Sequence, residues 1–348
     1  MQSKLKEPKV NELNQPIKGV SLWKDAWRRL KKNKLAMFGL VMVIIYSIIA
    51  LTASILPIYS YKRQVIEHQY LPPSLTKTAG EMLLEKEREM MLALAKKAGR
   101  EELNEQEKQK LEELEQRIET ETMEVDGKTI KTHERRYILG TDPLGRDLLA
   151  RVVYGSQVSI AIGLIGTITS VLIGVFIGAL AGYLGGKVDY IITRVIDVMY
   201  GLPYMMLVII LMAIFGRNIF NLFFALAIVS WLTVARVVRG QIISLKNSEF
   251  VEAARSVGAS TGRIIFRHLV PNTLGIIVVF TTLRIPSFIM MESFLSFLGL
   301  GVQAPFASWG SLVSEGVEGM NLFPWRLFFP AAVMVVFLFS MNFLGDGD

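Results

Sequence analysis

The chain has no cysteine and only three histidines among its 348 residues. The absence of cysteine excludes disulfides, thiolate zinc sites and cysteine nucleophiles. The histidines, His68, His133 and His268, are scattered along the sequence and show no spacing typical of metal ligands. The sequence therefore predicts no metal site and no cofactor bound by this chain.

The common motifs of nucleotide-using and hydrolytic enzymes are missing as well. The nearest approach to a Walker A phosphate loop is YLGGK at 183–187, but the first glycine of that motif would fall on Ala181. Val188 stands where a Ser or Thr would hold magnesium. No Ser, His and Asp residues form a recognisable nucleophilic triad. We therefore expect a chain without catalytic residues.

Charge is scarce along several long stretches. The apolar fraction is 51% and the mean hydropathy is +0.40, both high for a soluble domain. A membrane-spanning helix needs about 20 largely apolar residues. The stretches that meet this need are 35–57, 152–186, 198–216, 218–235 and 327–345, all without charge, and 272–298, which carries Arg284 and Glu292. They predict an all-α membrane protein with six transmembrane helices.

Basic charge is concentrated at the N-terminus. Residues 1–34 contain ten Lys or Arg and three Asp or Glu, which equals the net charge of +7. A basic excess can indicate nucleic-acid binding, but Trp23 and Trp27 among these charges, beside an apolar stretch, are typical of an interfacial cytoplasmic segment. A basic disordered tail is the alternative for residues 1–18. We expect contact with the lipid bilayer and none with nucleic acid.

The distribution of Lys and Arg also predicts the topology. The loop 236–267 has six basic and two acidic residues, so it falls inside together with the N-terminus. Six crossings then return the C-terminus to the cytoplasm. The predicted organisation is a cytoplasmic segment at 1–34, an uncleaved first span at 35–57, an extracytoplasmic insertion at 58–154, and a core of five spans at 155–348 with a cytoplasmic loop at 236–272.

The insertion contains a strongly charged stretch, 81–120, with twelve acidic and eight basic residues. Leucines and other apolar residues recur there at helical spacing on both sides of Gly99. This pattern predicts two amphipathic helices joined as an αα-hairpin. The hairpin is either a docking surface or a passive appendage.

Small residues recur every fourth position in the second span. This spacing places them on one helix face and lets another helix approach closely, within the chain or across a subunit interface. The residues are Gly166, Ser170, Gly174, Gly178 and Gly182.

A short polar segment between two apolar stretches, NSEFVEAARSVGASTGRIIFRHLVPN at 247–272, is the most informative part of the chain. Asn247 or Ser248 can cap a short helix that Gly258 ends in a left-handed conformation. A second helix over 259–269 then enters the next span at Pro271. Low side chains at Ala253 and Ala254 leave a surface that can lie in a groove of a partner.

This segment resembles the cytoplasmic coupling loop of ABC-importer permeases. The pattern of that loop is EAA, three residues, Gly, nine residues and Ile-x-Leu-Pro. His268 and Val270 depart from it, and an ordinary polar loop with an incidental EAA tripeptide is the alternative. The resemblance implies that the residues contacting a separate ATPase are Glu252, Ala253, Ala254, Arg255, Gly258 and Pro271.

Other segments resemble the C-type permeases of dipeptide, oligopeptide and nickel importers. They are SLWKDAWRRLKKNKLAMFGL at 21–40, LGTDPLGRDLLARVVYG at 139–155 and ESFLSFLGLGVQAPFASWG at 292–310. In the second of these, Asp142 is expected to cap a helix that begins at Pro143. The final NFLGDGD resembles the family's C-terminal segment without the usual cytoplasmic tail.

The resemblance implies a type I ABC importer permease of a bacterial inner or plasma membrane. Its implied partners are a homologous B-type permease subunit, two ABC ATPase subunits that bind ATP and magnesium, and an extracytoplasmic peptide-binding protein. A nickel or other small-solute importer is an alternative. An ATP-independent secondary transporter or a membrane-anchored scaffold is a more distant one.

Two charges inside the sixth stretch are candidates for the substrate path. Charged residues within spans are rare and usually face a cavity or a partner. Arg284 is suited to a substrate carboxylate and Glu292 to a substrate amine. A structural ion pair with a partner subunit, or a position near the membrane surface, is the alternative for both.

Overall fold

The computed structural model describes residues 22–125 and 127–346, and side chains from residue 27 onwards. Residues 1–21 of the predicted basic segment and the last two residues of NFLGDGD lie outside the described residues. The helices are α1 (Leu22–Lys32), α2 (Lys34–Thr52), α3 (Ala79–Lys97), α4 (Glu105–Thr120), α5 (Leu148–Leu184), α6 (Gly186–Gly201), α7 (Tyr204–Phe215), α8 (Ile219–Leu245), α9 (Glu249–Ser256), α10 (Thr261–Arg263), α11 (Val270–Asn272), α12 (Leu274–Phe297), α13 (Trp309–Val317) and α14 (Trp325–Gly345). A 3₁₀ turn, η2 (Ile66–His68), a π-helix, η3 (Ile264–Leu269), and two strands, β1 (Thr122–Val125) and β2 (Lys128–Lys131), complete the fold.

Five of the described helices are long and apolar enough to cross a membrane: α2, α5, α8, α12 and α14. The 37 residues of α5 extend for about 55 Å at 1.5 Å per residue, well beyond a hydrocarbon core of about 30 Å. The helix therefore continues into the segments on one or both sides of the membrane. This helical, multi-span architecture confirms the predicted fold class.

The remaining apolar stretch is bent. Helices α6 and α7 meet at 87° around Leu202 and Pro203, and together they can count as a sixth span. Pro203 fixes its own φ and lacks an N–H donor, so it ends the ladder of α6 and begins that of α7. With 12 residues, α7 alone is too short to cross a bilayer.

The small-residue face of α5 lies against two other helices of the same chain. A Cβ at Gly174 would lie 2.5 Å from Cβ of Val234, and one at Gly178 would lie 2.4 Å from the Ala235 carbonyl oxygen, both on α8. Gly166 faces Phe288 of α12 in the same way. The small residues thus let α8 and α12 approach the backbone of α5 closely, and at these positions the face packs within the chain.

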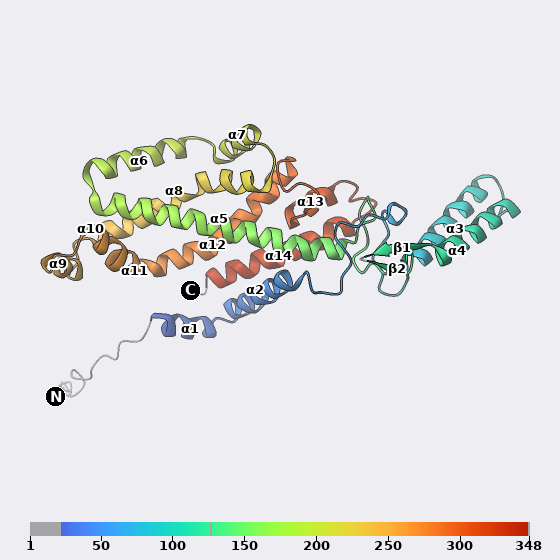
Figure 1. Cartoon of the computed structure of the whole chain (residues 1–348), viewed down its shortest axis with the longest axis horizontal. Coiled ribbons are helices and arrows are strands. Elements are labelled where there is room, and N and C mark those ends of the chain that lie inside the picture. Colours follow the sequence, from blue (N-terminus) through green and yellow to red (C-terminus); the bar gives the residue numbers. More distant parts are fainter. Residues whose placement is uncertain (1–21, 126, 347–348) are drawn as a thin grey trace, which may run out of the picture.

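Helix α2 packs on the last helix, α14. The Tyr46 hydroxyl donates to the Val333 carbonyl (2.9 Å), and Gly39 lies against the Ser340 carbonyl, where a Cβ would come within 2.4 Å. The Tyr46 ring also makes an edge contact with Trp309. The first and last spans are therefore neighbours, although they are far apart in the sequence (Figure 1).

The segment between α2 and α5 contains the αα-hairpin of α3 and α4. Each helix begins with a capping box: Thr78 with Glu81 for α3, and Asn104 with Glu107 for α4. Gly99, with a φ of +75°, lies at the turn between them. At the base of the hairpin, β1 and β2 pair antiparallel in a two-stranded ribbon.

The chain enters α5 through a buried ionic cluster that the sequence did not predict. Asp142 accepts hydrogen bonds from the side chains of Arg146 (2.6 Å) and Arg151 (2.9 Å), and Arg151 also pairs with Glu315. Asp142 therefore organises a turn, while the cap of α5 is Asp147, whose carboxylate accepts from two backbone N–H groups. The expectation of a helix capped by Asp142 and beginning at Pro143 is wrong, because Oδ1 of Asp142 accepts only from the backbone of a short turn, at Leu144 and Arg146, and the helix begins at Leu148.

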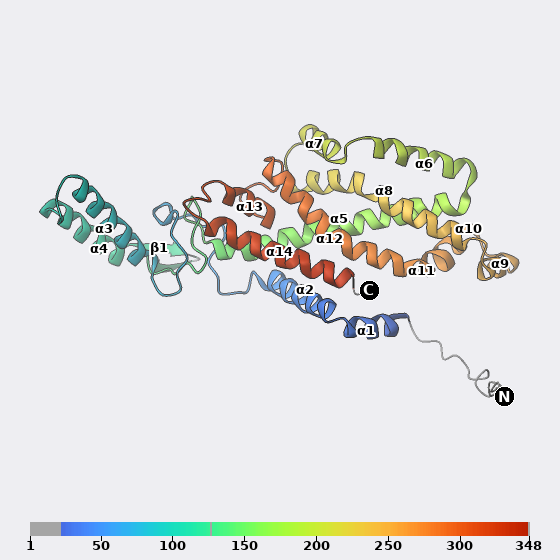
Figure 2. The same ribbon diagram turned by 180° about the vertical axis from the view of Figure 1, so that it is seen from behind.

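The molecule is elongated, and its two ends differ. The α3–α4 hairpin projects from one end of the helical bundle, and α9 and α10 form the other end (Figure 1). The view from behind in Figure 2 shows the same separation. The polar segment after α8 and the hairpin therefore lie at opposite ends of the apolar helices.

Candidate functional site

The short helix α9 is the centre of the polar segment. Ser248 precedes it in an extended conformation, but its hydroxyl donates to the Leu245 carbonyl (2.6 Å) instead of capping α9. Glu249 and Glu252 lie in the first turn, where negative charge interacts favourably with the helix dipole. Glu252 is exposed, and its carboxylate forms no ion pair with any described residue.

Gly258 ends α9 in a left-handed conformation, with a φ of +79°. Its N–H bonds to the Arg255 carbonyl, and the Ala259 N–H reaches back to the Ala254 carbonyl (3.0 Å). Nothing lies within 4 Å of a Cβ built on Gly258. Glycine is therefore required here by the backbone conformation and not by crowding.

The inner face of α9 is fixed to the bundle. Val251 is fully buried and Ala254 is nearly so, and both join a cluster formed by α5, α8, η3 and α12. The Arg255 guanidinium lies over the ring of Tyr183 on α5, 5.5 Å from its centroid, and donates to the Lys246 carbonyl. Of the two alanines expected on the partner surface, Ala253 is exposed and Ala254 packs inside the chain.

Helical structure runs from α10 through η3 into α11 and reaches α12 after Thr273. Pro271 has no N–H group, so it cannot donate a helical hydrogen bond to the Arg267 carbonyl. The wider π turns of η3 lie directly before Pro271 and accommodate this missing bond. Packed helical turns therefore connect α9 to α12.

A cavity of about 490 Å³ lies where the bent α6–α7 pair meets α8 and α12. Its wall is mixed apolar and hydroxyl-bearing, with Tyr200, Tyr204, Ser230 and Thr233 in addition to Arg284. The Tyr204 hydroxyl bonds to Ser230 (2.9 Å), and the Tyr200 hydroxyl to Thr233 (2.7 Å). These hydroxyls offer hydrogen bonds to a polar solute between apolar helices.

Arg284 and Glu292 do not lie together. Arg284 lines the cavity and pairs with no carboxylate in the described part of the chain. Glu292 is fully buried, and its Oε1 accepts hydrogen bonds from Ser296 (2.6 Å) and from Ser308 (2.7 Å) at the start of α13. The two charges, both of them sequence-based candidates for the substrate path, thus have different surroundings.

Sequence reasoning missed most of the cavity wall. Tyr200, Ser230 and Thr233 belong to apolar stretches, and an isolated hydroxyl in such a stretch gives no signal of its own. The one available signal was the Leu202-Pro203 step inside an apolar run, because an interrupted helix exposes irregular backbone only where a cavity or protein covers it.

These features define a class of protein: a multi-span helical membrane protein with a polar helix packed on one end of the bundle and a cavity lined by an arginine between its helices. A family model described as binding-protein-dependent transport system inner membrane component matches residues 174–347. A second, described as the N-terminal TM domain of oligopeptide transport permease C, matches residues 21–73. The chain belongs to the family of inner membrane components of binding-protein-dependent transport systems.

Two similar curated proteins extend over nearly the whole chain, and a third covers a shorter part of it. The oligopeptide transport system permease protein OppC of Bacillus subtilis is 34% identical over 95% of this chain and 88% of its own length. The dipeptide transport system permease protein DppC of the same organism is 38% identical over 94% of this chain and 84% of its own length. OppC of Haemophilus influenzae is 47% identical over 62% of this chain and 70% of its own length.

Among solved structures, an inward-facing conformation of the MetNI methionine ABC transporter aligns with a TM-score of 0.46 at 17% identity. It covers 56% of this chain and 93% of the matched chain.

Proposed function

We propose that this chain is the pore-forming membrane subunit of an ATP-driven importer of oligopeptides or dipeptides. Its relatives of similar length are permease proteins of oligopeptide and dipeptide transport systems, at 34% and 38% identity. The observation that carries the proposal is α9, which is pinned on its inner face and presents Glu252 and Ala253 on its outer face. A chain that only passes solute needs no such protruding helix.

The proposed partners are those that the resemblance to ABC-importer permeases implies. Two ABC ATPase subunits, which bind ATP and magnesium, contact α9 on the cytoplasmic side of a bacterial inner or plasma membrane. A homologous B-type permease completes the pore, and an external binding protein delivers the peptide. Nucleotide-driven closure of the ATPases moves α9, and the packed turns of η3 and α11 transmit the movement to α12.

Within this proposal, the substrate path passes the cavity at Arg284. An unpaired guanidinium among tyrosine and serine hydroxyls suits a peptide carboxylate or carbonyl. Glu292 holds α13 against α12 and is not assigned to the path.

The test is uptake by the complete complex in proteoliposomes. The complex, with its binding protein, should import a labelled peptide only when ATP is supplied on the side of α9. Unlabelled peptide should compete, and Ni²⁺ should not. Uptake that proceeds without ATP would indicate a secondary transporter, and competition by Ni²⁺ alone would indicate a metal importer.

A further inference from the structure

Two of the three histidines, scattered in the sequence, come together at the base of the α3–α4 hairpin. His68 is in η2, and His133 follows β2. The Nε2 atom of His68 lies 2.9 Å from Nδ1 of His133, and both residues are buried. On its far side, His68 Nδ1 lies 2.7 Å from the Tyr137 hydroxyl.

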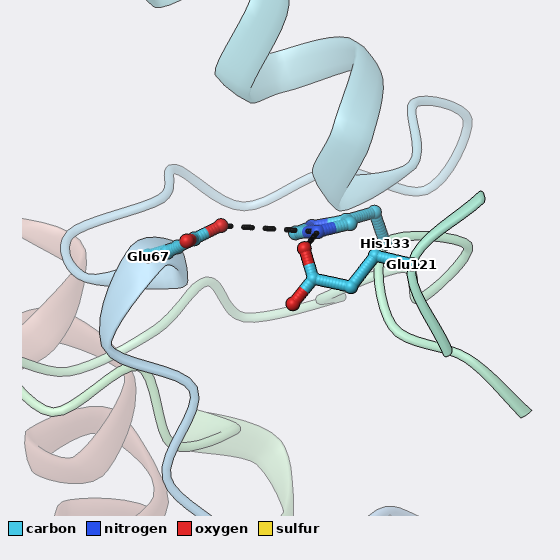
Figure 3. Close-up of side chains that lie close together, drawn as sticks. All are labelled: Glu67, Glu121 and His133. Carbon is cyan, nitrogen blue, oxygen red and sulfur yellow. Dashed lines mark hydrogen bonds and ion pairs between the residues drawn. The ribbon is translucent and has the colours of Figure 1, made fainter. Parts of the chain in front are cut away.

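The free edge of the His133 ring faces two carboxylates. Its Nε2 atom lies 3.0 Å from Oε2 of Glu121 and 3.8 Å from Oε2 of Glu67, and Figure 3 shows the two glutamates converging on the ring. Ligand atoms of all three residues lie within 4.8 Å of one another. Neighbouring ligands of a tetrahedral ion at about 2.0–2.1 Å from the metal are separated by about 3.3 Å, so only small side-chain shifts are needed.

We propose that Glu67, Glu121 and His133 bind a divalent transition metal of the Zn²⁺ type. One imidazole nitrogen and two carboxylate oxygens leave a fourth tetrahedral position for water. The imidazole distinguishes this site from one for Ca²⁺ or Mg²⁺, which take oxygen ligands. The sequence predicted no metal, because the ligands come from three segments that only the fold brings together.

The buried histidine behind the site fits this assignment. When a neutral His133 donates from Nε2–H to Glu121, its Nδ1 accepts from His68, and His68 Nδ1 accepts from the Tyr137 hydroxyl. With metal on Nε2, each tautomer reverses: His133 donates to His68, and His68 donates to the Tyr137 oxygen. Every ring nitrogen keeps a partner in both arrangements.

Arg117 lies beside the two carboxylates. Its guanidinium lies 3.2 Å from Glu67 and 4.0 Å from Glu121. The side chain is 55% exposed, so it can turn into solvent when a cation takes its place. A metal there would connect η2, the end of α4 and the segment after β2, and so fix the hairpin to the body of the protein.

The experiment uses the complete complex in lipid nanodiscs, stripped of metal and titrated with Zn²⁺ against a chromophoric chelator, with Ca²⁺ and Mg²⁺ in parallel. The wild type should bind one more Zn²⁺ than Glu67→Gln/Glu121→Gln, whose affinity at this site should fall at least about 100-fold. Tyr137→Phe should weaken binding by about 10- to 100-fold, the range for groups that orient a ligand. Arg117→Gln should tighten it.

Glu134→Gln is the matched control, because Glu134 is an exposed carboxylate nearby that pairs with Lys131 and lies outside the site. It should bind Zn²⁺ as the wild type does. Equal Zn²⁺ binding by the wild type and the double glutamine variant would overturn the proposal. So would binding of Ca²⁺ as tight as that of Zn²⁺, since the imidazole would then have no role. The two glutamates are partly exposed, so this comparison does not depend on replacing a buried residue.

Discussion

Gly178 sets how closely α5 and α8 approach each other. Gly178→Ala would place a methyl group 2.4 Å from the Ala235 carbonyl oxygen, a backbone atom that cannot turn away. We expect the helices to separate at a cost of about 1–3 kcal/mol, seen as a lower midpoint of thermal unfolding of the purified complex.

The control for this variant is Gly240→Ala in α8. That glycine is helical, and nothing lies within 4 Å of a Cβ built on it. It should be neutral or slightly stabilising, because Ala is the better helix former. Equal unfolding midpoints for the two variants would show that the contact between α5 and α8 is not tight.

Arg284 tests the substrate path. Arg284→Gln keeps a hydrogen-bonding side chain of similar polarity but removes the charge that lines the cavity. We expect peptide uptake to fall at least about tenfold, in line with a charge-assisted hydrogen bond worth about 1.5–3 kcal/mol, while Arg284→Lys retains most of it. Wild-type uptake by Arg284→Gln would remove this residue from the path.

The sequence predicted the conformation of single residues where the backbone requirement is local. It did not predict the surroundings of residues whose neighbours come from other elements. Gly258 was expected to be left-handed and has a φ of +79°. The surroundings of Glu292 depend on Ser308, sixteen residues away on another element, and could not be read from its neighbours. The same holds for Ala254, whose burial is set by α5 and η3.

The hairpin is the clearest element for a test of partner docking. Its distal part, residues 89–110, carries ten of the twenty charged residues in 81–120, while its base packs on the body through Leu71, Ala79, Met82 and Tyr137. Replacing residues 89–110 with a short Gly/Ser linker should therefore spare assembly. We expect stimulation of ATPase activity by the binding protein to weaken, more at low than at high binding-protein concentration.

A passive hairpin predicts an unchanged concentration dependence in the same assay. Loss of assembly would place the distal hairpin in a subunit interface instead.

At the scale of elements, the length of an apolar stretch predicted the membrane-spanning helices. It did not predict where a helix is bent or interrupted. Helices α2, α5, α8, α12 and α14 each overlap a stretch chosen for its apolar length, although α5 and α8 extend well beyond theirs, because a span must satisfy its backbone internally. The 87° bend between α6 and α7 and the π turns before Pro271 were not predicted. Both occur at prolines, where the sequence shows a conflict but not how the chain resolves it.

At the scale of the molecule, the predicted topology can be tested with cysteines, since the chain has none of its own. The hairpin tip at Gly99 and α9 lie at opposite ends of the bundle (Figure 1). A membrane-impermeant thiol reagent should label Gly99→Cys in intact cells and should not label Ser256→Cys. The reverse labelling pattern would show that the chain is inserted in the opposite orientation.

The family could be inferred from sequence because its motifs are local, whereas the cavity and the histidine pair required the fold. The 247–272 segment and the 139–155 and 292–310 segments are each continuous. The hydroxyl-lined cavity draws on four helices, and the site at Glu67 draws on three separate segments.

The central claim is that α9 transmits the work of a separate ATPase to the pore. Glu252→Lys reverses an exposed charge on its outer face, and Gly258→Val forces a β-branched residue into a left-handed conformation. Gly262→Ala is the matched control, because that glycine is helical and has nothing within 4 Å of a built Cβ.

The deciding measurement is peptide uptake together with binding-protein-stimulated ATPase activity in assembled, reconstituted complexes. The account predicts that both activities fall together in Glu252→Lys and Gly258→Val and stay at the wild-type level in Gly262→Ala. Uptake at the wild-type rate in both α9 variants would contradict it.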